Sequence, residues 1–208
     1  MFKKRKIISK RQEYRLAQKE LDLERIKVNV PITDTVPIVD THNICTEAAL
    51  IAYHAHVHSR IGYGILLWGN GSEVDRILIL QKRCLRNIYN LKQQDSCRRL
   101  FGQLGILTVV STYIYEASVF IKKHNDLFSG HMKTHSYSTR NKSDLVYNRT
   151  NLSYIQKNTH CSIIRVFNWL PSCLRQLPLK RFKIKLKNFL AKRTYYTMEE
   201  YFSDTFRC

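Results

Sequence analysis

EVDRILILQKRCLRNIYN, the stretch from Glu73 to Asn90, carries the clearest structural signal in this chain of 208 residues. Its apolar side chains recur at a spacing that gathers them on one face of an α-helix. That face is made of Ile77, Leu80, Cys84, Ile88 and, just beyond the stretch, Leu91. Ser72 is the expected N-cap, because its hydroxyl can accept a hydrogen bond from a free amide of the first turn. The stretch therefore predicts a helix with one buried face.

The same helix carries cations away from that apolar face. Arg76, Arg83 and Arg86 recur at helical spacing, and Lys82 lies beside Arg86. Guanidinium groups about one turn apart can follow successive phosphates of a duplex. We expect these residues to contact nucleic acid, and the alternative is a basic face that meets only water.

Further segments on both sides have helical patterns. The expected helices are Glu47–His58, Glu73–Asn90, Asp95–Phe101, a long helix capped by Thr108 that runs to His124, Cys161–Leu174 and Leu179–Arg193. Residues 125–160 between them are polar, which predicts a long loop. The chain is thus expected to be all-α, with two small helical clusters joined by a long polar loop and preceded by a basic N-terminal extension.

The stretch from Leu104 to Ile121 is apolar enough to suggest a membrane span. Glu116 interrupts it, and Lys122 closes it at about the minimum spanning length. Its apolar residues recur at helical spacing, at Ile106, Val110, Tyr113, Ala117 and Phe120. A buried helix is expected, with no membrane span.

Charge is the largest deviation in composition. Lys and Arg number 35 against 16 Asp and Glu, for a formal net charge of +19. The commonest polyanion inside a cell is nucleic acid, so RNA or DNA is the expected partner. An acidic protein partner is the alternative that the same charge would satisfy.

Residues 1–44 differ in composition from the rest of the chain, and we expect them to form a basic, partly helical extension. Its cluster of cations predicts a nuclear localisation signal, made of Lys3, Lys4, Arg5, Lys6, Lys10 and Arg11. A solvated tail is the alternative.

The six cysteines include no C-x-x-C pair, so we expect a reduced, intracellular setting.

Leu179–Arg193 is the second basic helix. Its apolar stripe consists of Leu179, Phe182, Leu186, Phe189 and Leu190, and lysines and arginines, among them Lys183 and Lys187, fill the rest. Such a helix can bind nucleic acid, an anionic membrane or a protein partner. The first expectation is that the stripe docks onto the chain's own core and leaves the cations free for phosphates.

The polar loop holds a Y-x-T-R-x-K block with Tyr137, Arg140 and Lys142. An aromatic ring and cations on a loop can stack on unpaired bases and pair with phosphates. An ordinary loop anchor explains the block equally well.

Motifs for enzymatic or metal chemistry are missing. His54, His56 and His58 invite a zinc interpretation, but no acidic or Cys ligand lies at a familiar spacing. The sequence offers no Ser/His/Asp set and no Gly-rich phosphate loop. We therefore expect no metal, no cofactor and no catalytic residue.

Eight blocks carry a resemblance to a known family. They are YGILLWGNG (63–71), LQKRCLRNIYNLK (80–92), DSCRRLF (95–101), LGIL (104–107), HSYSTRNK (135–142), VFNWLP (166–171), FKIKLKNFL (182–190) and YYTMEEYF (195–202). In this order they resemble the region just after the polymerase core in reverse transcriptases of insect non-LTR retrotransposons, the jockey-like and related mobile elements. The resemblance implies a thumb-like region at 45–128 and a C-terminal loop and helical tail at 129–208. Residues 1–44 do not match.

Polymerases of that family hold two metal ions with an aromatic-x-Asp-Asp box and an earlier Asp. This chain has no adjacent pair of aspartates. The resemblance thus implies a fragment of an RNA-directed DNA polymerase without its catalytic palm, which is not an enzyme by itself and at most binds nucleic acid without sequence preference. A host-retained adaptor that binds a protein, and a relic without function, remain alternatives.

Overall fold

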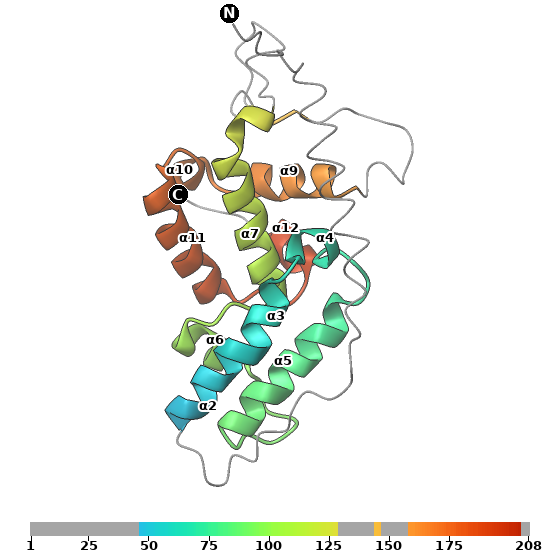
Figure 1. Ribbon diagram of the computed structural model, residues 1–208, viewed down its shortest axis with the longest axis vertical. Coiled ribbons are helices and arrows are strands. Elements are labelled where there is room, and N and C mark those ends of the chain that lie inside the picture. Colours follow the sequence, from blue (N-terminus) through green and yellow to red (C-terminus); the bar gives the residue numbers. More distant parts are fainter. Residues whose placement is uncertain (1–45, 129–143, 147–157, 205–208) are drawn as a thin grey trace, which may run out of the picture. The chain divides into compact units, whose positions relative to one another are not determined.

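The computed structural model describes residues 46–128, 144–146 and 158–204, all within one compact unit of the chain. Every regular element among them is a helix (Figure 1), which confirms the all-α prediction. The elements are α2 (Thr46–Ala52), η2 (Tyr53–His58, a π-helix), α3 (Ser59–Gly62), α4 (Ile65–Trp68), α5 (Val74–Ile88), α6 (Arg98–Leu104), α7 (Val109–Lys123), η3 (Asn125–Leu127, a 3-10 helix), α9 (Thr159–Trp169), α10 (Ser172–Arg175), α11 (Leu179–Arg193) and α12 (Met198–Ser203).

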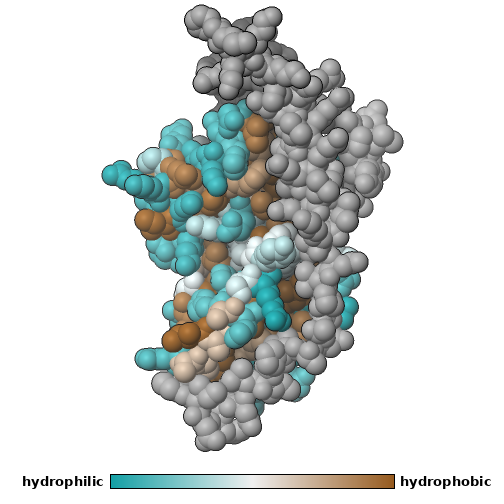
Figure 2. Space-filling view, viewed as in Figure 1, coloured by the Kyte–Doolittle hydropathy of each residue, from teal (hydrophilic) through white to brown (hydrophobic). Residues whose placement is uncertain are grey.

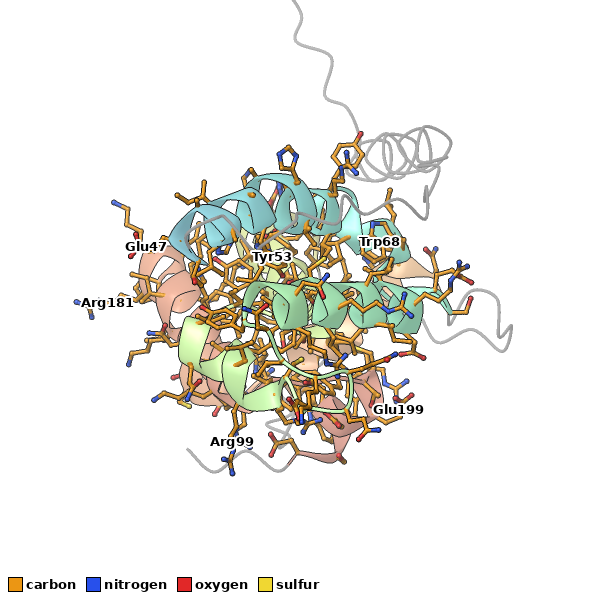
Figure 3. The ribbon with its side chains drawn as sticks, turned by 90° about the horizontal axis from the view of Figure 1, so that it is seen from below. Glu47, Tyr53, Trp68, Arg99, Arg181 and Glu199 are labelled. Atoms are coloured by element: carbon orange, nitrogen blue, oxygen red, sulfur yellow. The ribbon has the colours of Figure 1, made fainter. Side chains whose placement is uncertain are left out.

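The first helical run is longer than predicted. α2, η2 and α3 follow one another without a break, so the helix expected to end at His58 continues to Gly62. Its middle is a π turn, a local widening of the helix that is often found at functional sites. Tyr53 begins this turn and points into the interior (Figure 3), where its ring is buried.

α5 forms where the sequence predicts a helix, but its buried face differs. The buried residues are Val74, Leu78, Gln81 and Leu85. The predicted apolar residues Ile77, Leu80 and Cys84 are only half-buried, on the flank of that face. Ser72 is not the cap, because Glu73 holds the cap position and no side chain bonds there.

A polar side chain at the centre of the buried face explains the difference. The amide nitrogen of Gln81 donates to the hydroxyl of Tyr53 at 2.8 Å and to the carbonyl of Leu107 at 2.9 Å. Its amide oxygen accepts from the backbone N–H of Val109 at 3.0 Å. Gln81 thus joins α5 to η2 and to the start of α7, and these bonds offset the cost of burying it.

α7 is the central helix of the unit and packs most extensively against α9 and α11 (Figure 1). The predicted cap is confirmed, because the Thr108 hydroxyl accepts from the backbone N–H of Ser111 at 3.1 Å. It also donates to the carbonyl of Tyr195 at 2.6 Å, which fixes the end of α11 to the start of α7. Tyr113, Ile114 and other residues of α7 are fully buried, as expected for a core helix.

Helices from both sides of the long polar segment share one hydrophobic core. Ile114 and Ile121 of α7, Ile164 of α9 and Leu186 of α11 belong to the same buried cluster. The regions predicted as separate clusters, 45–128 and 129–208, are therefore not independent bodies. Burial of α7 depends on residues from the C-terminal region.

The C-terminal helices agree with the sequence in part. α11 spans Leu179–Arg193 as predicted, whereas the segment 161–174 is not one helix. α9 ends at Trp169, and Leu170 is extended at ψ 144° because the following Pro171 disfavours helical backbone. α12 was not predicted.

Among the described residues no single helix is long and apolar enough to cross a membrane. α6 and α7 together would be long and apolar enough, with a bend of 45° between them.

Cys84, Cys97 and Cys161 are free thiols. Cys173 is disulfide-bonded, so the expectation of reduced cysteines does not hold there.

Candidate nucleic-acid interface

α11 carries exposed cations around the sides that face away from its buried stripe. The helix docks through Phe182, Leu186 and Leu190, which are fully buried, and it ends at Thr194, whose φ of 47° is left-handed. Docking onto the core, the first expectation for this helix, is thereby confirmed. The cations away from this stripe are exposed, and we call them the α11 cationic face: Lys180, Arg181, Lys183, Lys185, Lys187 and Lys192. Figure 2 shows hydrophilic residues over α10 and α11, and Arg181 points into solvent in Figure 3.

Among the described residues, the charges of the α11 cationic face are not engaged in ion pairs, although Glu116 of α7 lies near Lys183. The ion pairs that the structure describes use other cations, as in Arg193 with Asp204, Arg98 with Glu200 and Arg175 with Asp144. None of the six members takes part in one. Lys183 and Lys187, both predicted to contact nucleic acid, belong to this face. Their charge is available to an anionic ligand.

One edge of this face adjoins η2 and α7. Burial raises the pKa of Glu116 on α7, and the nearby positive charge of Lys183 opposes that rise. Burial also lowers the pKa of His58 on η2, and the neighbouring His54 and Lys187 lower it further. Protonating His58 would add another positive charge beside Lys187.

The predicted cations of α5 are only partly free. Arg76 forms an exposed ion pair with Glu73, with 3.3 Å between Nη1 and Oε2. Arg83 is exposed and makes no ion pair within the described residues. It is the α5 cation that remains most available to a phosphate.

Arg86 holds a loop. Its Nε and Nη2 both donate to the backbone carbonyl of Asp95, at 3.2 and 2.9 Å. The Asp95 carboxylate in turn accepts from the backbone N–H of Lys92 at 2.9 Å. Two of the five N–H donors of the Arg86 guanidinium are therefore already used by the turn between α5 and α6, so a phosphate contact would have to use the remaining N–H groups on Nη1 and Nη2.

Lys82 lies against an aromatic ring. Its Nζ is 3.8 Å from the ring centroid of Tyr196, and the Cζ of Arg98 is 4.4 Å from the same centroid. Partial burial lowers the pKa of Lys82, and the neighbouring charge of Arg86 adds to this effect. Cation–π contacts of this kind are worth roughly 0.5–1 kcal/mol where they are solvent-exposed.

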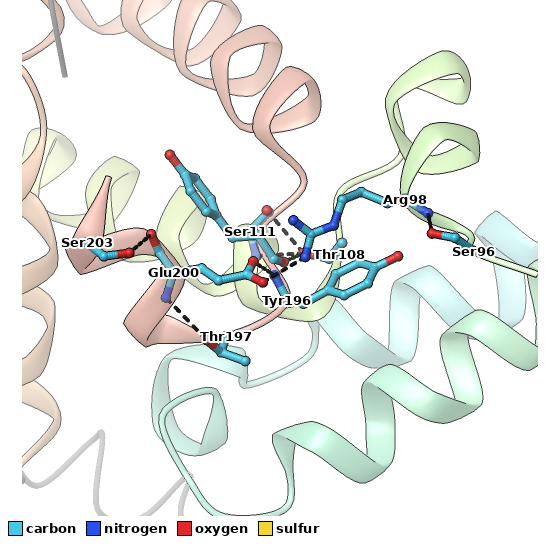
Figure 4. Close-up of polar contacts among 9 residues, drawn as sticks. Ser96, Arg98, Thr108, Ser111, Tyr196, Thr197, Glu200 and Ser203 are labelled. Carbon is cyan, nitrogen blue, oxygen red and sulfur yellow. Dashed lines mark hydrogen bonds and ion pairs between the residues drawn. The ribbon is translucent and has the colours of Figure 1, made fainter. Parts of the chain in front are cut away.

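Glu200 organises this cluster (Figure 4). Its carboxylate accepts from Arg98 at 2.7 Å and from the backbone N–H of Tyr196 at 2.9 Å. The hydroxyl of Thr197 caps α12 by accepting from the backbone N–H of Glu200 at 3.2 Å. Burial alone would raise the pKa of Glu200, but the hydrogen bonds from Tyr196 and Arg98 outweigh it and lower the pKa. Lys82 and Arg98 thus serve mainly to join α5, α6 and α12.

Sequence reasoning missed Arg98, Tyr196 and Glu200 as parts of this cluster. A signal was present, because Thr197 and Glu200 have the T-x-x-E spacing of a capping box. That spacing identifies the start of α12. The stacking of Lys82 on Tyr196 depends on residues more than a hundred positions apart, which no local pattern links.

Other predicted residues lie outside the described part of the chain. These are the loop residues Tyr137, Arg140 and Lys142, and the basic cluster Lys3, Lys4, Arg5, Lys6, Lys10 and Arg11. Within the described ranges no group of three or more His, Cys, Asp or Glu side chains could hold a metal ion. His54 and His58 do lie together, with ring centroids 5.5 Å apart.

Comparison of the chain with protein-family models, with curated proteins and with solved structures found no match. The retrotransposon resemblance therefore rests on the quoted sequence blocks.

Proposed function

We propose that this chain is the C-terminal segment of a non-LTR retrotransposon RNA-directed DNA polymerase without its catalytic palm, and that it holds RNA or DNA without reading base sequence. The observation that carries the binding role is the α11 cationic face. Its six cations are exposed and form no ion pair with the described residues. The order of the sequence blocks supports the family origin.

The geometry of α11 suits phosphate contacts. Lys180, Lys183 and Lys187 follow one another at three- and four-residue spacing, which places them along one side of the helix about one turn of 5.4 Å apart. The buried stripe holds the helix against α7, so these charges are presented on a rigid support. Base-specific reading commonly uses paired hydrogen bonds to base edges, which the planar groups of Arg, Asn and Gln form with the most fixed geometry. The face consists mostly of Lys, which acts as a point charge on phosphates.

The salt dependence of binding tests this proposal. Replacing Lys183 and Lys187 by Gln should reduce the slope of log K against log salt by about two units, because each duplex phosphate contact contributes about 0.9. Gln retains helix propensity. The matched control replaces Arg60 and Arg99, two exposed cations on α3 and α6. It removes the same net charge and should leave the slope within about half a unit of the parent's. Equal slopes for both variants, measured near physiological ionic strength, would refute a local contact by α11.

The adaptor alternative has one observation in its favour. Ile184 is 65% exposed, and its position on the helix lies opposite the buried stripe among the cations. An apolar side chain ringed by charge is common in protein interfaces. If the face binds an acidic protein, an acidic peptide should bind in a manner that depends on Ile184, and nucleic-acid binding should be weak and insensitive to Lys183 and Lys187.

A further inference from the structure

We propose that Trp169, Phe202 and Arg165 form a stacking platform for an unpaired nucleobase of single-stranded RNA or DNA. This inference rests on the proposed nucleic-acid-binding function and adds to it a preference for unpaired strands. Duplex phosphates would be met by α11, whereas the platform would hold a base that has no partner strand. Three further observations support it.

The first observation is the arrangement of the rings. Arg165 and Trp169 are four residues apart on α9, so they lie on the same side of the helix. The ring centroids of Trp169 and Phe202 are 5.7 Å apart with the planes at 81°. Because this contact is edge to face, it supports the indole without stacking on it. Trp169 is 43% exposed, an unusual state for the largest side chain, and its indole N–H makes no hydrogen bond among the described residues.

The second observation is the charge beside the rings. The Cζ of Arg165 is 4.7 Å from the ring centroid of Phe202. Arg165 is exposed and forms no ion pair with any described carboxylate, including Glu199 on α12. Single-strand binders combine aromatic rings, on which bases of any sequence stack, with cations that meet the backbone phosphates. A guanidinium that is stacked on a ring and has no anionic partner in the described part of the chain complements that ligand.

The third observation is that the platform is rigid. The Tyr201 hydroxyl donates to the carbonyl of Val166 at 2.9 Å, which fastens α12 to α9. Tyr201 is fully buried, and Leu170 beside Trp169 is 1% exposed. The rings are therefore held in place before a ligand arrives, which reduces the entropy lost on binding. A base would stack on the exposed part of the Trp169 indole without rearranging the helices.

Tryptophan fluorescence provides a direct test. Trp68 and Trp169 are the two tryptophans of the chain, so the Trp68→Phe variant reports on Trp169 alone. Titration with short unstructured oligo(rU) and oligo(dT) should quench the indole emission, and a duplex of equal length should not. The two oligonucleotides compare RNA with DNA. Similar quenching is expected for both, because stacking does not involve the 2′-hydroxyl. Unquenched emission with bound single strands would overturn the proposal.

Affinity measurements on the otherwise unchanged chain keep the test independent of Trp68. By fluorescence anisotropy, Trp169→Leu should weaken single-strand binding about tenfold, within the range for loss of one stacked base. Duplex binding should be unaffected. Trp169→Tyr should restore most of the affinity, because it keeps an aromatic face. A Trp169→Leu variant that melts like the parent and binds single strands as tightly would refute the platform.

Failure of this inference can be distinguished from failure of the proposed function. If the platform is wrong and the function right, single strands and duplexes both respond to the Lys183 and Lys187 substitutions and neither responds at Trp169. If the chain binds neither ligand near physiological ionic strength, the proposed function fails and the platform fails with it.

Discussion

The side-chain amide of Gln81 on α5 donates a 2.8 Å hydrogen bond, in the interior, to the hydroxyl of Tyr53 on η2, 28 positions earlier in the sequence. Both residues are buried. Burial raises the pKa of Tyr53 to about 12, although the bond from Gln81 opposes the rise. The phenol therefore stays neutral and acts as an acceptor across the physiological range.

Replacing Gln81 by Leu should strongly destabilise the fold. The substitution leaves the Tyr53 hydroxyl, the Leu107 carbonyl and the Val109 amide without their partner, and a loss of about 3 kcal/mol in unfolding free energy is expected. Urea denaturation measures it. The control is Gln103→Leu on the exposed side of α6, which should change stability by less than about 0.5 kcal/mol. A similar effect for both would show that the buried hydrogen bonds carry no net stability.

The two neighbouring arginines of α5 should behave differently. Arg86→Gln removes two bonds to the Asp95 carbonyl and should cost about 1 kcal/mol of unfolding free energy. Arg83→Gln should leave stability within about 0.5 kcal/mol and reduce the salt slope of duplex binding by about one unit. Urea melts and salt titrations of both variants measure these effects. The reverse pattern, with Arg83 structural and Arg86 affecting only binding, would contradict the assigned roles.

The contribution of His58 to stability should be lost on mild acidification. The pKa of His58 is lowered from 6.5 in the folded chain, so below about pH 6.5 the unfolded chain binds the extra proton more readily. Unfolding free energy is therefore lost as the pH decreases from there toward the folded pKa. His58→Gln should flatten this dependence between about pH 7 and pH 5, measured by thermal or urea melts. It should remove only a part, because burial also lowers the pKa of His160. An unchanged pH profile in the variant would contradict the role of His58.

The purified chain should not polymerise. With a primed RNA template, nucleotides and Mg²⁺ or Mn²⁺ we expect no extension, because the sequence has no adjacent aspartates to hold two metal ions. A no-protein reaction is the background. Template-dependent product above that background would overturn the assignment of the chain as a fragment without its palm.

Residues 1–30 should direct a large cytosolic reporter into the nucleus. The basis is the basic cluster of Lys3, Lys4, Arg5, Lys6, Lys10 and Arg11. Changing all six to Gln in the same fusion is the matched control. Imaging that shows the unmodified fusion distributed as the reporter alone would remove the prediction.

Local patterns predicted much of the helical content. The stripe of Leu179–Arg193 predicted α11 and its docking, and Thr108 predicted the start of α7, because both signals depend on neighbours within one or two helical turns. Pro171 ends the helix within the segment 161–174, and this effect of proline is also local. The T-x-x-E pattern at Thr197 is likewise a local signal for the start of α12.

The buried face of α5 and the state of its cations could not be predicted locally. A glutamine is ordinarily placed on the surface, and only the approach of Tyr53, Leu107 and Val109 makes the interior acceptable to Gln81. Lys82 is drawn to Tyr196, and Arg86 to a carbonyl nine residues away. Each partner reaches its place through packing of other helices.

The sequence by itself determined that the chain is helical and strongly basic, since periodicity and charge are properties of the residues in order. The tertiary structure decided which charges are free. α11 keeps its cations exposed because it packs against the core through its apolar stripe. Lys82 and Arg86 instead lie at the junction of α5, α6 and α12, where Lys82 contacts the ring of Tyr196 and Arg86 donates to the carbonyl of Asp95. It also decided that Trp169 stays partly exposed beside Phe202 of α12, which its ring meets edge to face.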